Sequence, residues 1–242
     1  MPTIAIVSEY NPFHNGHLYQ IQKIKELFPE STVISVMSGN LVQRGEIALF
    51  NKYDRAKIAG KNGVDAVFEL PSVYSNAPAN IFAFSAVYIL HKLSGVDFLC
   101  FGSESGELES LDFAAEKIMS EDFKSRLHDT IKTNKNNNYP KNIYNLFHEL
   151  YGEEKAAVLN GSNNILAIEY LKAIKTLNSD IKPLTIKRTG ADFNASASYI
   201  RANIANHDIK NFMPESAYKI FRDLINAKRD TASYSCIFYF FW

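Results

Sequence analysis

This sequence has few cysteines and no net charge. Two cysteines, Cys100 and Cys236, occur among 242 residues, and neither belongs to a C-x-x-C pair. Their spacing indicates neither a zinc site nor a disulfide framework and is typical of a protein in a reducing cytosol. Lys plus Arg and Asp plus Glu both number 26. This balance argues against a protein that coats nucleic acid non-specifically, because such binding depends on neutralising many phosphates.

Long hydrophobic runs and internal repeats are also missing. No stretch approaches the ~18 consecutive apolar residues of a transmembrane helix. The N-terminus has an early acidic residue, Glu9, and no cationic start. We therefore expect no signal peptide and no membrane span, and a cytoplasmic protein. The 46% hydrophobic content suffices for one large α/β domain, or for a domain with an appendage.

The most informative segment that is present reads IAIVSEYNPFHNGHLYQ and covers residues 4–20. Residues 4–7 are a short apolar run typical of a buried parallel strand, and Asn11-Pro12 ends it. From about Asn15 onward a helix is predicted, so His14 and His17 would lie in the loop and the first helical turn. The apolar residues that recur at helical spacing there are Leu18, Ile21, Ile24 and Leu27.

The two histidines of this H-x-G-H pattern are the predicted catalytic residues. Unpaired backbone N–H groups collect at a helix start and favour phosphate. Gly16 lets a triphosphate approach the backbone, and the imidazoles of His14 and His17 can hydrogen-bond phosphates where charge builds up during transfer. A single histidine near a helix start is usually a cap or a surface residue. Two of them directly after an apolar strand match the signature of the nucleotidyltransferase superfamily, whose members attack the α-phosphate of a nucleotide and release pyrophosphate.

Strand and helix patterns alternate through the first 120 residues. This alternation predicts an α/β fold with a Rossmann-like, doubly wound parallel sheet and a helical C-terminal appendage. Ligands of such sheets bind beyond the carboxyl ends of the strands. The further strands are expected at 32–37, 65–70, 97–101 and 183–186, and the further helices at 53–61, 80–93, 108–119, 123–131, 165–177, 196–205 and 218–225.

After residue 106 the alternating strand and helix patterns give way mainly to amphipathic helix patterns, and we expect the chain to have three parts. An ATP-binding domain of the nucleotidyltransferase type would comprise residues 1–130 and about 160–205. Residues 131–160 would be a helical and loop insertion, in which the Asn-rich stretch 132–141 is predicted to be an exposed linker or loop. Residues 206–242 would begin a helical C-terminal region that is cut short.

Further candidate ligand residues lie in the predicted loops. Gln43 and Arg44 follow the second strand, and an arginine can hold a carboxylate or a phosphate by two parallel hydrogen bonds. Gly102 either gives a ribose or base access to the backbone or belongs to a simple turn. Asn163, before an apolar helix, is more often a cap than a ligand.

A second phosphate-binding pattern comes late in the chain. Lys187 and Arg188 precede the run S-A-S-Y-I-R, which contains Ser196, Ser198 and Arg201. Hydroxyl groups at a helix start and a following arginine can hold phosphates. Alone this run is a weak signal, but paired with the upstream H-x-G-H it supports a nucleotidyltransferase.

Six segments in a fixed order narrow the resemblance: SEYNPFHNGHLYQI, MSGNLVQRGE, ELPSVYS, FGSE, SNNILAIEYLKAI and ASASYIR. Together, over Ile4 to about Arg201, they resemble the tRNA-Met cytidine acetate ligase family of the H-x-G-H superfamily. The resemblance implies a ligase that uses ATP and acetate to make acetyl-adenylate. It would then transfer the acetyl group to the N4 amine of the wobble cytidine of elongator tRNA-Met.

The resemblance also implies an ATP site and its chemistry. Acetate is already ionised at pH 7, so positioning and electrostatics would suffice without a general base. Mg²⁺ is expected to bridge phosphate oxygens, although no carboxylate cage and no protein metal ligand are predicted. The implied ATP-binding residues are Val7, Ser8, Glu9, Tyr10, Asn11, Pro12, Phe13, His14, Asn15, Gly16, His17, Leu18, Tyr19, Gln20, Gly102, Asn163, Lys187 and Arg188.

Two departures from the family keep alternatives open. The family continues with helical sequence that helps to engage tRNA, whereas this chain stops at Trp242 after an aromatic run at 234–241, and the stretch 188–196 is shorter than usual. Residues 182–229 carry nine basic against four acidic residues, which suits tRNA phosphates. A small-molecule adenylyltransferase acting on a mononucleotide or pantetheine phosphate, and a nucleotide- or RNA-binding module without turnover, remain alternatives. The oligomeric state is not predicted.

Overall fold

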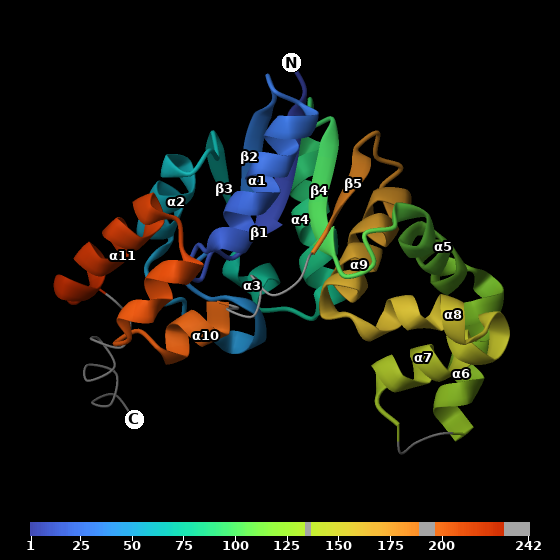
Figure 1. The fold of residues 1–242 in the computed structure, drawn as a ribbon. Helices are drawn as coiled ribbons and strands as arrows, with labels where there is room; N and C mark the ends of the chain where they lie inside the picture. Colours follow the sequence, from blue (N-terminus) through green and yellow to red (C-terminus); the bar gives the residue numbers. More distant parts are fainter. Residues whose placement is uncertain (134–136, 189–196, 230–242) are drawn as a thin grey trace.

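A five-stranded parallel sheet forms the centre of the protein (Figure 1). The computed structural model describes residues 1–133, 137–188 and 197–229. The strand order is β3-β2-β1-β4-β5. The strands are β1 Thr3–Ser8, β2 Thr32–Ser38, β3 Ala66–Leu70, β4 Phe98–Ser103 and β5 Lys182–Lys187.

The chain reverses its direction of travel across the sheet next to β1. It moves outward from β1 to β3 and then returns to place β4 on the other side of β1. In doubly wound sheets, ligands bind at the carboxyl ends of the strands beside such a reversal. The predicted fold class is therefore confirmed, and the β1–β4 junction is where a site is expected.

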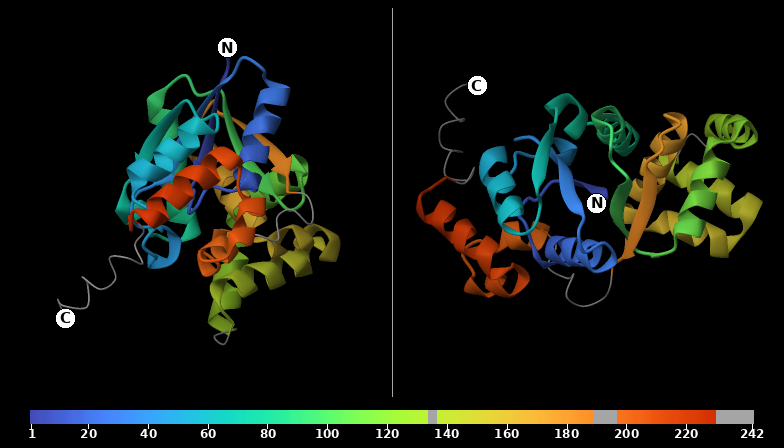
Figure 2. Two further views of the ribbon diagram at one scale, coloured as in Figure 1. Left: turned by 60° about the vertical axis from the view of Figure 1, so that its left-hand side comes forward. Right: turned by 90° about the horizontal axis from the view of Figure 1, so that it is seen from above.

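Helices cover both faces of the sheet (Figure 2). Side chains of α1, α2, α10 and α11 share one apolar cluster with Ile4 and Ile6 of β1. Those of α4 and α9 share the other cluster with Ala5. This alternation along β1 is the period of two that a strand buried on both faces requires. The helices are α1 Asn15–Leu27, α2 Lys52–Lys61, α3 Ser72–Ser75, α4 Ala79–Leu93, α9 Ser162–Thr176, α10 Ala197–Ala202 and α11 Glu215–Asn226, with 3₁₀ turns η1 Gln43–Gly45 and η4 His207–Phe212.

A group of helices lies beyond the β5 edge of the sheet, on the right of Figure 1. The predicted linker at 132–141 is partly wrong, because α6 continues through Thr133 and α7 begins at Tyr139. Asn138 caps α7 by accepting a hydrogen bond from the Lys141 backbone N–H at 3.0 Å, and Pro140 suits the first turn. The group comprises α5 Leu108–Met119, α6 Glu121–Thr133, α7 Tyr139–Tyr151, α8 Glu153–Ala156 and η2 Ala157–Asn160.

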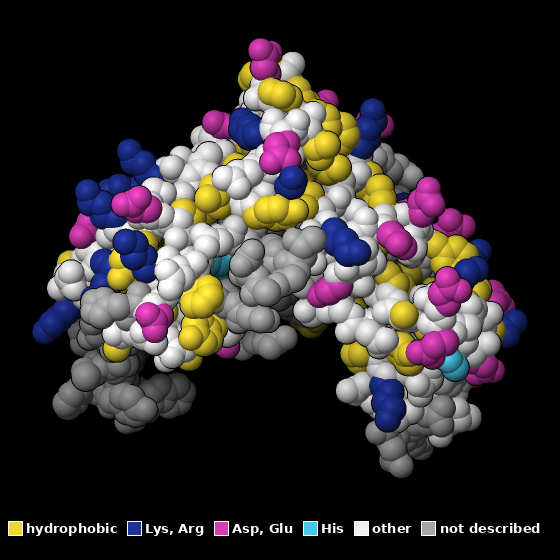
Figure 3. Space-filling model, in the orientation of Figure 1, with side chains coloured by type: hydrophobic (Ala, Val, Ile, Leu, Met, Phe, Trp, Pro, Cys, Tyr) yellow, Lys and Arg dark blue, Asp and Glu magenta, His cyan; other side chains and the backbone are white. Residues whose placement is uncertain are grey.

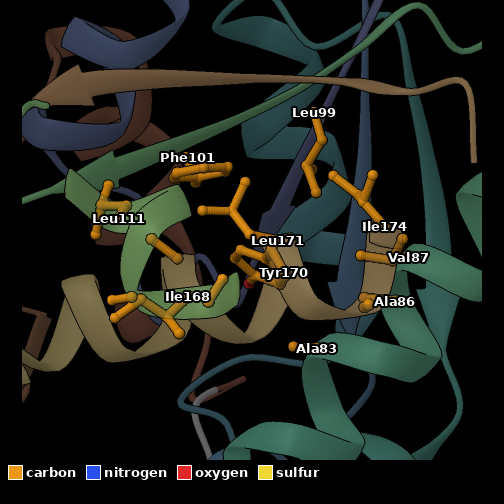
Figure 4. Packing of buried hydrophobic residues seen from close by; sticks show 14 of the residues in the cluster. Ala83, Ala86, Val87, Leu99, Phe101, Leu111, Ile168, Tyr170, Leu171 and Ile174 are labelled. Atoms are coloured by element: carbon orange, nitrogen blue, oxygen red, sulfur yellow. The ribbon is translucent and has the colours of Figure 1, made fainter. Parts of the chain in front are cut away.

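The larger apolar cluster holds α9 against α4 and β4 (Figure 4). Small residues of α4 let the two helices approach closely, and each larger apolar side chain contributes about 1.5–3 kcal/mol when fully buried. This packing fixes the start of α9 near the carboxyl ends of β4 and β5. The residues in contact include Ala83, Ala86 and Val87 of α4, Leu99 and Phe101 of β4, and Ile168, Leu171 and Ile174 of α9.

Several predicted boundaries shift in the structure. The helix expected at 165–177 begins earlier, at Ser162, and α11 begins directly after Pro214. Ser196, Cys236 and the aromatic run at 234–241 lie outside the described residues, and the division into three parts stays a prediction. Within the described ranges, none of the helices is long and apolar enough to cross a membrane.

Candidate functional site

A cavity of about 250 Å³ opens at the carboxyl ends of β1, β4 and β5. It lies at the β1–β4 reversal, as the topology predicts. Most of the predicted ATP-binding residues line it, whereas Pro12, Phe13, Asn15 and Leu18 do not. Those that line it are Val7, Ser8, Glu9, Tyr10, Asn11, His14, Gly16, His17, Tyr19, Gln20, Gly102, Asn163, Lys187 and Arg188.

The two histidines cap the first turn of α1 reciprocally. His14 is the N-cap residue, and its Nδ1 accepts a hydrogen bond from the Gly16 backbone N–H at 3.0 Å. His17 lies in the third helical position, and its Nδ1 accepts from the His14 backbone N–H at 3.2 Å. The rings stack with their centroids 3.8 Å apart. Histidines here occupy the positions that Ser or Thr and Glu hold in a usual capping box.

This capping determines the chemical state of both rings. A nitrogen that accepts a hydrogen bond carries no proton, so the proton of each neutral ring is on Nε2. Burial, assisted by the positive charge of Arg188, lowers the pKa of His14 to about 4. Burial also lowers the pKa of His17 well below its ordinary value, with further contributions from His14 and Arg188. At neutral pH both rings are therefore uncharged donors through Nε2–H.

The backbone N–H groups that we expected to meet phosphate directly are mostly occupied. The Gly16 N–H donates to His14 Nδ1, and the N–H groups of His17 and Leu18 donate to the His14 carbonyl oxygen at 2.9 and 3.3 Å. The positive end of the α1 dipole thus acts on His14 Nδ1. A ligand in the cavity would meet that field through the imidazole N–H groups.

Aromatic packing supports the histidine pair from behind. Phe13 is almost fully buried, and its ring centroid lies 5.3 Å from that of His17 and 5.0 Å from that of Tyr10. Phe13 is thus a core residue beneath the site instead of a lining residue. Asn15 also points elsewhere, because its side chain donates to the Asn211 carbonyl oxygen at 2.9 Å.

Arg188 comes to the same cavity from the end of β5. Its backbone N–H donates to the Ser103 carbonyl oxygen at 2.9 Å, and its Nη1 donates to Asn163 Oδ1 at 2.8 Å. A Cβ on Gly102 would lie only 3.2 Å from Arg188 Cγ. Gly102 therefore leaves room for the Arg188 side chain, a role that the sequence did not suggest.

The remaining predicted contacts are only partly brought to the cavity. Gln43 lines it, while Arg44 lies in η1 and its side chain is outside the described atoms. Arg201 does not line it, because its guanidinium donates to the Asn11 carbonyl oxygen at 2.7 Å and to the Glu46 carboxylate at 3.1 Å. Ser198 accepts from Arg201 at 3.4 Å. Arg201 thus supports the histidine loop from outside.

The sequence alone did not identify the apolar residues that line the cavity, nor Arg55, whose side chain binds backbone carbonyl groups after β1 and at the end of β2. Arg55 of α2 is almost fully buried and donates to the Phe50 and Ser38 carbonyl oxygens, each at 3.0 Å, and to those of Glu9 and Gly39. It lies within a mostly polar helix, and nothing in its local sequence predicts its burial. The missed lining residues are Phe82, Phe101, Leu166, Tyr170, Ile186 and Ala197.

Glu9 contributes the single carboxylate among the described residues that line the cavity. Burial raises its pKa, although the Gln43 backbone N–H and the charges of Arg201 and Arg55 act in the opposite direction. The Gln43 N–H donates to Glu9 Oε1 at 2.9 Å. Nowhere in the described residues do three or more His, Cys, Asp or Glu side chains gather as a metal site would require.

The chain is similar to known proteins over nearly its whole length. A family model described as HIGH Nucleotidyl Transferase matches residues 1–241. A relative named tRNA(Met) cytidine acetate ligase from Caldicellulosiruptor bescii is 47% identical over 91% of this chain and 56% of its own length. The protein of that name from Caldicellulosiruptor saccharolyticus is 41% identical over 100% of this chain and 62% of its own length.

Solved structures give the same picture. The crystal structure of Thermotoga maritima TmcAL bound with alpha-thio ATP superposes with a TM-score of 0.88 and 37% identity, over 95% of this chain and 57% of that one. This chain thus spans a little more than half the length of the relatives and structures it matches. On the strength of the matched model and the H-x-G-H pair at the end of β1, the chain belongs to the HIGH nucleotidyl transferase family.

Proposed function

We propose that this chain activates acetate with ATP and transfers the acetyl group to N4 of the wobble cytidine of elongator tRNA-Met. One observation carries the proposal: two neutral histidine donors and the charge of Arg188 meet in one cavity at the β1–β4 reversal. The names of the similar proteins support acetate and tRNA-Met as substrates, and the ATP analogue bound in the similar structure supports ATP.

The first step would join acetate to the α-phosphate of ATP. A carboxylate oxygen of acetate attacks the α-phosphorus, the bond from that phosphorus to the bridging oxygen breaks, and pyrophosphate leaves. Negative charge grows on the leaving group and the phosphoryl oxygens. The Nε2–H groups of His14 and His17 and the cationic groups of Lys187 and Arg188 would stabilise that charge.

The second step would consume the acetyl-adenylate. The N4 amine of cytidine attacks the carbonyl carbon, the bond from this carbon to the phosphate oxygen breaks, and AMP leaves while the amine loses a proton. The tRNA would approach the region 182–229, with its nine basic and four acidic residues. A tRNA substrate agrees with the expected cytoplasmic location.

Mg²⁺ would enter with the nucleotide. This ion keeps several waters and commonly binds to substrate phosphates with one or two carboxylates. Glu9 is the one carboxylate that the described cavity lining offers. The phosphates of ATP and water molecules would therefore supply most of the ligands of Mg²⁺.

Acetate-dependent exchange of labelled pyrophosphate into ATP tests the first step. We expect exchange with acetate and formation of acetohydroxamate when hydroxylamine is added as a trapping nucleophile. Exchange that requires a mononucleotide or pantetheine phosphate instead would favour a small-molecule adenylyltransferase. ATP binding without exchange for any of these substrates would favour a non-catalytic module. Acetylation of tRNA-Met, followed by mass spectrometry of its nucleosides, tests the second step.

A further inference from the structure

The first turn of α9 is capped by a carboxylate from another element. The N-cap residue of α9 is Gly161, which has no side chain to serve the purpose. Glu104, in the loop after β4, supplies the acceptors instead: its Oε1 accepts from the Asn163 backbone N–H at 3.1 Å, and its Oε2 from the Asn164 N–H at 2.7 Å. In return, Asn164 Oδ1 accepts from the N–H groups of Glu104 and Ser105 at 2.9 and 3.2 Å.

The Asn163 side chain links this cap to the cavity. Its Nδ2 donates to Glu104 Oε1 at 2.6 Å, and its Oδ1 accepts from Arg188 Nη1 at 2.8 Å. A carboxylate can only accept and a guanidinium can only donate, so the two partners fix the orientation of the amide. Of the three residues, Asn163 and Arg188 line the cavity, whereas Glu104 does not.

Glu104 is held in its ionised form by this arrangement. Burial acts to raise its pKa, but the hydrogen bonds from the Asn163 side chain and from the backbone N–H groups of Asn163 and Asn164 outweigh burial, and the pKa is lowered. A carboxylate at a helix N-terminus is also favoured by the helix dipole. The amide of Asn163 therefore lies between a full negative and a full positive charge.

We propose that Glu104 is a positioning residue of the nucleotide site, which orients Arg188 through Asn163 without contacting the ligand. A direct Glu–Arg pair would neutralise the guanidinium and compete with a phosphate for it. A neutral amide orients the guanidinium without adding a negative charge beside it. The proposal rests on the proposed function in taking ATP as that ligand.

Arg188 is restrained from other directions as well. Its Cγ lies close to Gly102, and its backbone continues the pairing of β5 with β4. Its charge contributes to the low pKa of both His14 and His17, so it lies within electrostatic reach of the capping pair. A guanidinium that is ordered before the ligand arrives loses less conformational freedom on binding.

A double-mutant cycle on ATP binding tests the relay. Titration calorimetry with ATP and Mg²⁺, without acetate, measures Kd for the wild type, Glu104→Gln, Arg188→Gln and the double variant. We expect Glu104→Gln to raise Kd at least about fivefold in the chain that keeps Arg188. A Gln amide cannot accept from all three donors, which are the backbone N–H groups of Asn163 and Asn164 and the Asn163 side chain. Glu104→Gln should have little further effect beside Arg188→Gln. The matched control Glu107→Gln, an exposed residue of the same loop that accepts from Ser110, should leave Kd unchanged.

A second variant moves the carboxylate without changing any charge. A Cβ on Gly161 would overlap Glu104 Oε2, and the backbone φ of −94° tolerates alanine. Gly161→Ala should therefore weaken ATP binding in the wild type and have no further effect in Glu104→Gln. This variant remains informative if Glu104→Gln does not fold.

The outcomes separate the relay from the proposed function. Equal fold-changes for Glu104→Gln with and without Arg188, or wild-type affinity of Gly161→Ala, would overturn the relay even if acetate-dependent exchange is normal. Normal coupling in a chain that binds ATP but shows no acetate-dependent exchange would support the relay and reject the proposed reaction. A wild-type chain that does not bind ATP would overturn both.

Discussion

At the residue scale, His14 and His17 show what a motif predicts and what it leaves open. The sequence identified both residues and their places in the loop and first turn, because an apolar strand, Asn11-Pro12 and helical periodicity bracket them. It did not predict their protonation. That depends on which backbone N–H each Nδ1 receives and on burial, and both follow only from the folded loop.

The depressed pKa of His14 makes folding stability depend on pH. Between its unfolded pKa of 6.5 and its folded pKa of about 4, the unfolded state binds a proton that the native state does not. Stability is thus lost as pH falls through this window, by about 3 kcal/mol at about 1.4 kcal/mol per pKa unit. The variant His14→Asn keeps a capping acceptor and should lose less stability between these pH values. Urea unfolding at each pH measures the difference, and parallel curves for the two proteins would contradict it.

Removing the other imidazole should affect the reaction more than the fold. His17→Ala deletes one Nε2–H donor from the cavity, and loss of such a donor costs roughly 2.7–4 kcal/mol of transition-state stabilisation. We expect acetate-dependent pyrophosphate exchange to fall by roughly 10²–10³-fold. His128→Ala, at an exposed position of α6, is the control and should exchange normally. An unchanged rate in His17→Ala would exclude His17 from the chemistry.

At the element scale, α2 joins the ends of β1 and β2 through one buried side chain. The sequence predicted a helix at 53–61, close to the observed Lys52–Lys61, because a helical pattern is a local feature of the sequence. The inward direction of Arg55 was not predictable in the same way. It depends on the carbonyl group of Glu9, which follows β1, and on those of Ser38 and Gly39 at the end of β2. The α7 start was missed for the opposite reason, since one Asn of an apparent loop run serves as a helix cap.

Replacing Arg55 tests how far these loops depend on it. Burial lowers the pKa of Arg55 to about 10, so it stays charged at neutral pH. Arg55→Lys keeps the charge but loses the planar fork, leaving buried carbonyl groups unpaired at about 1–3 kcal/mol each. We expect a lower urea midpoint corresponding to at least about 2 kcal/mol, together with weaker ATP binding. Lys57→Met on the exposed side of α2 is the control, and a similar midpoint for both variants would contradict the assignment.

At the scale of the whole molecule, the sequence predicted the arrangement of strands and helices better than it predicted the residues that line the cavity. Alternating strands and helices implied a parallel sheet, and all neighbouring strands in the observed order β3-β2-β1-β4-β5 do pair in parallel. The sequence did not predict which apolar side chains line the cavity, because Phe82 and Tyr170 come from helices in which nothing local separates a lining residue from a core residue. In Figure 3, Asp and Glu side chains are mixed with Lys and Arg side chains both over the α5–α8 group on the right and over α2 and α11 on the left.

The pairing of basic residues at 182–229 bears on the proposed tRNA substrate. Of the nine basic residues at 182–229, Arg201 pairs with Glu46, Arg229 pairs with Asp54, and Arg222 donates to the Ile204 carbonyl oxygen. Each phosphate contact contributes roughly −0.7 to −0.9 to the slope of log affinity against log salt, so a few contacts give only modest affinity.

We therefore expect tRNA-Met binding that is measurable at about 50 mM salt and largely lost by about 200 mM. Filter binding across this range measures the slope. Lys219→Gln on the exposed side of α11 should weaken binding, and the loss of one phosphate contact should make the slope of log affinity against log salt shallower by roughly 0.7–0.9. Lys124→Gln on α6 should change neither the affinity nor the slope. Tight binding that scarcely varies with salt, or an equal effect of the two variants, would show that residues 182–229 do not hold the tRNA.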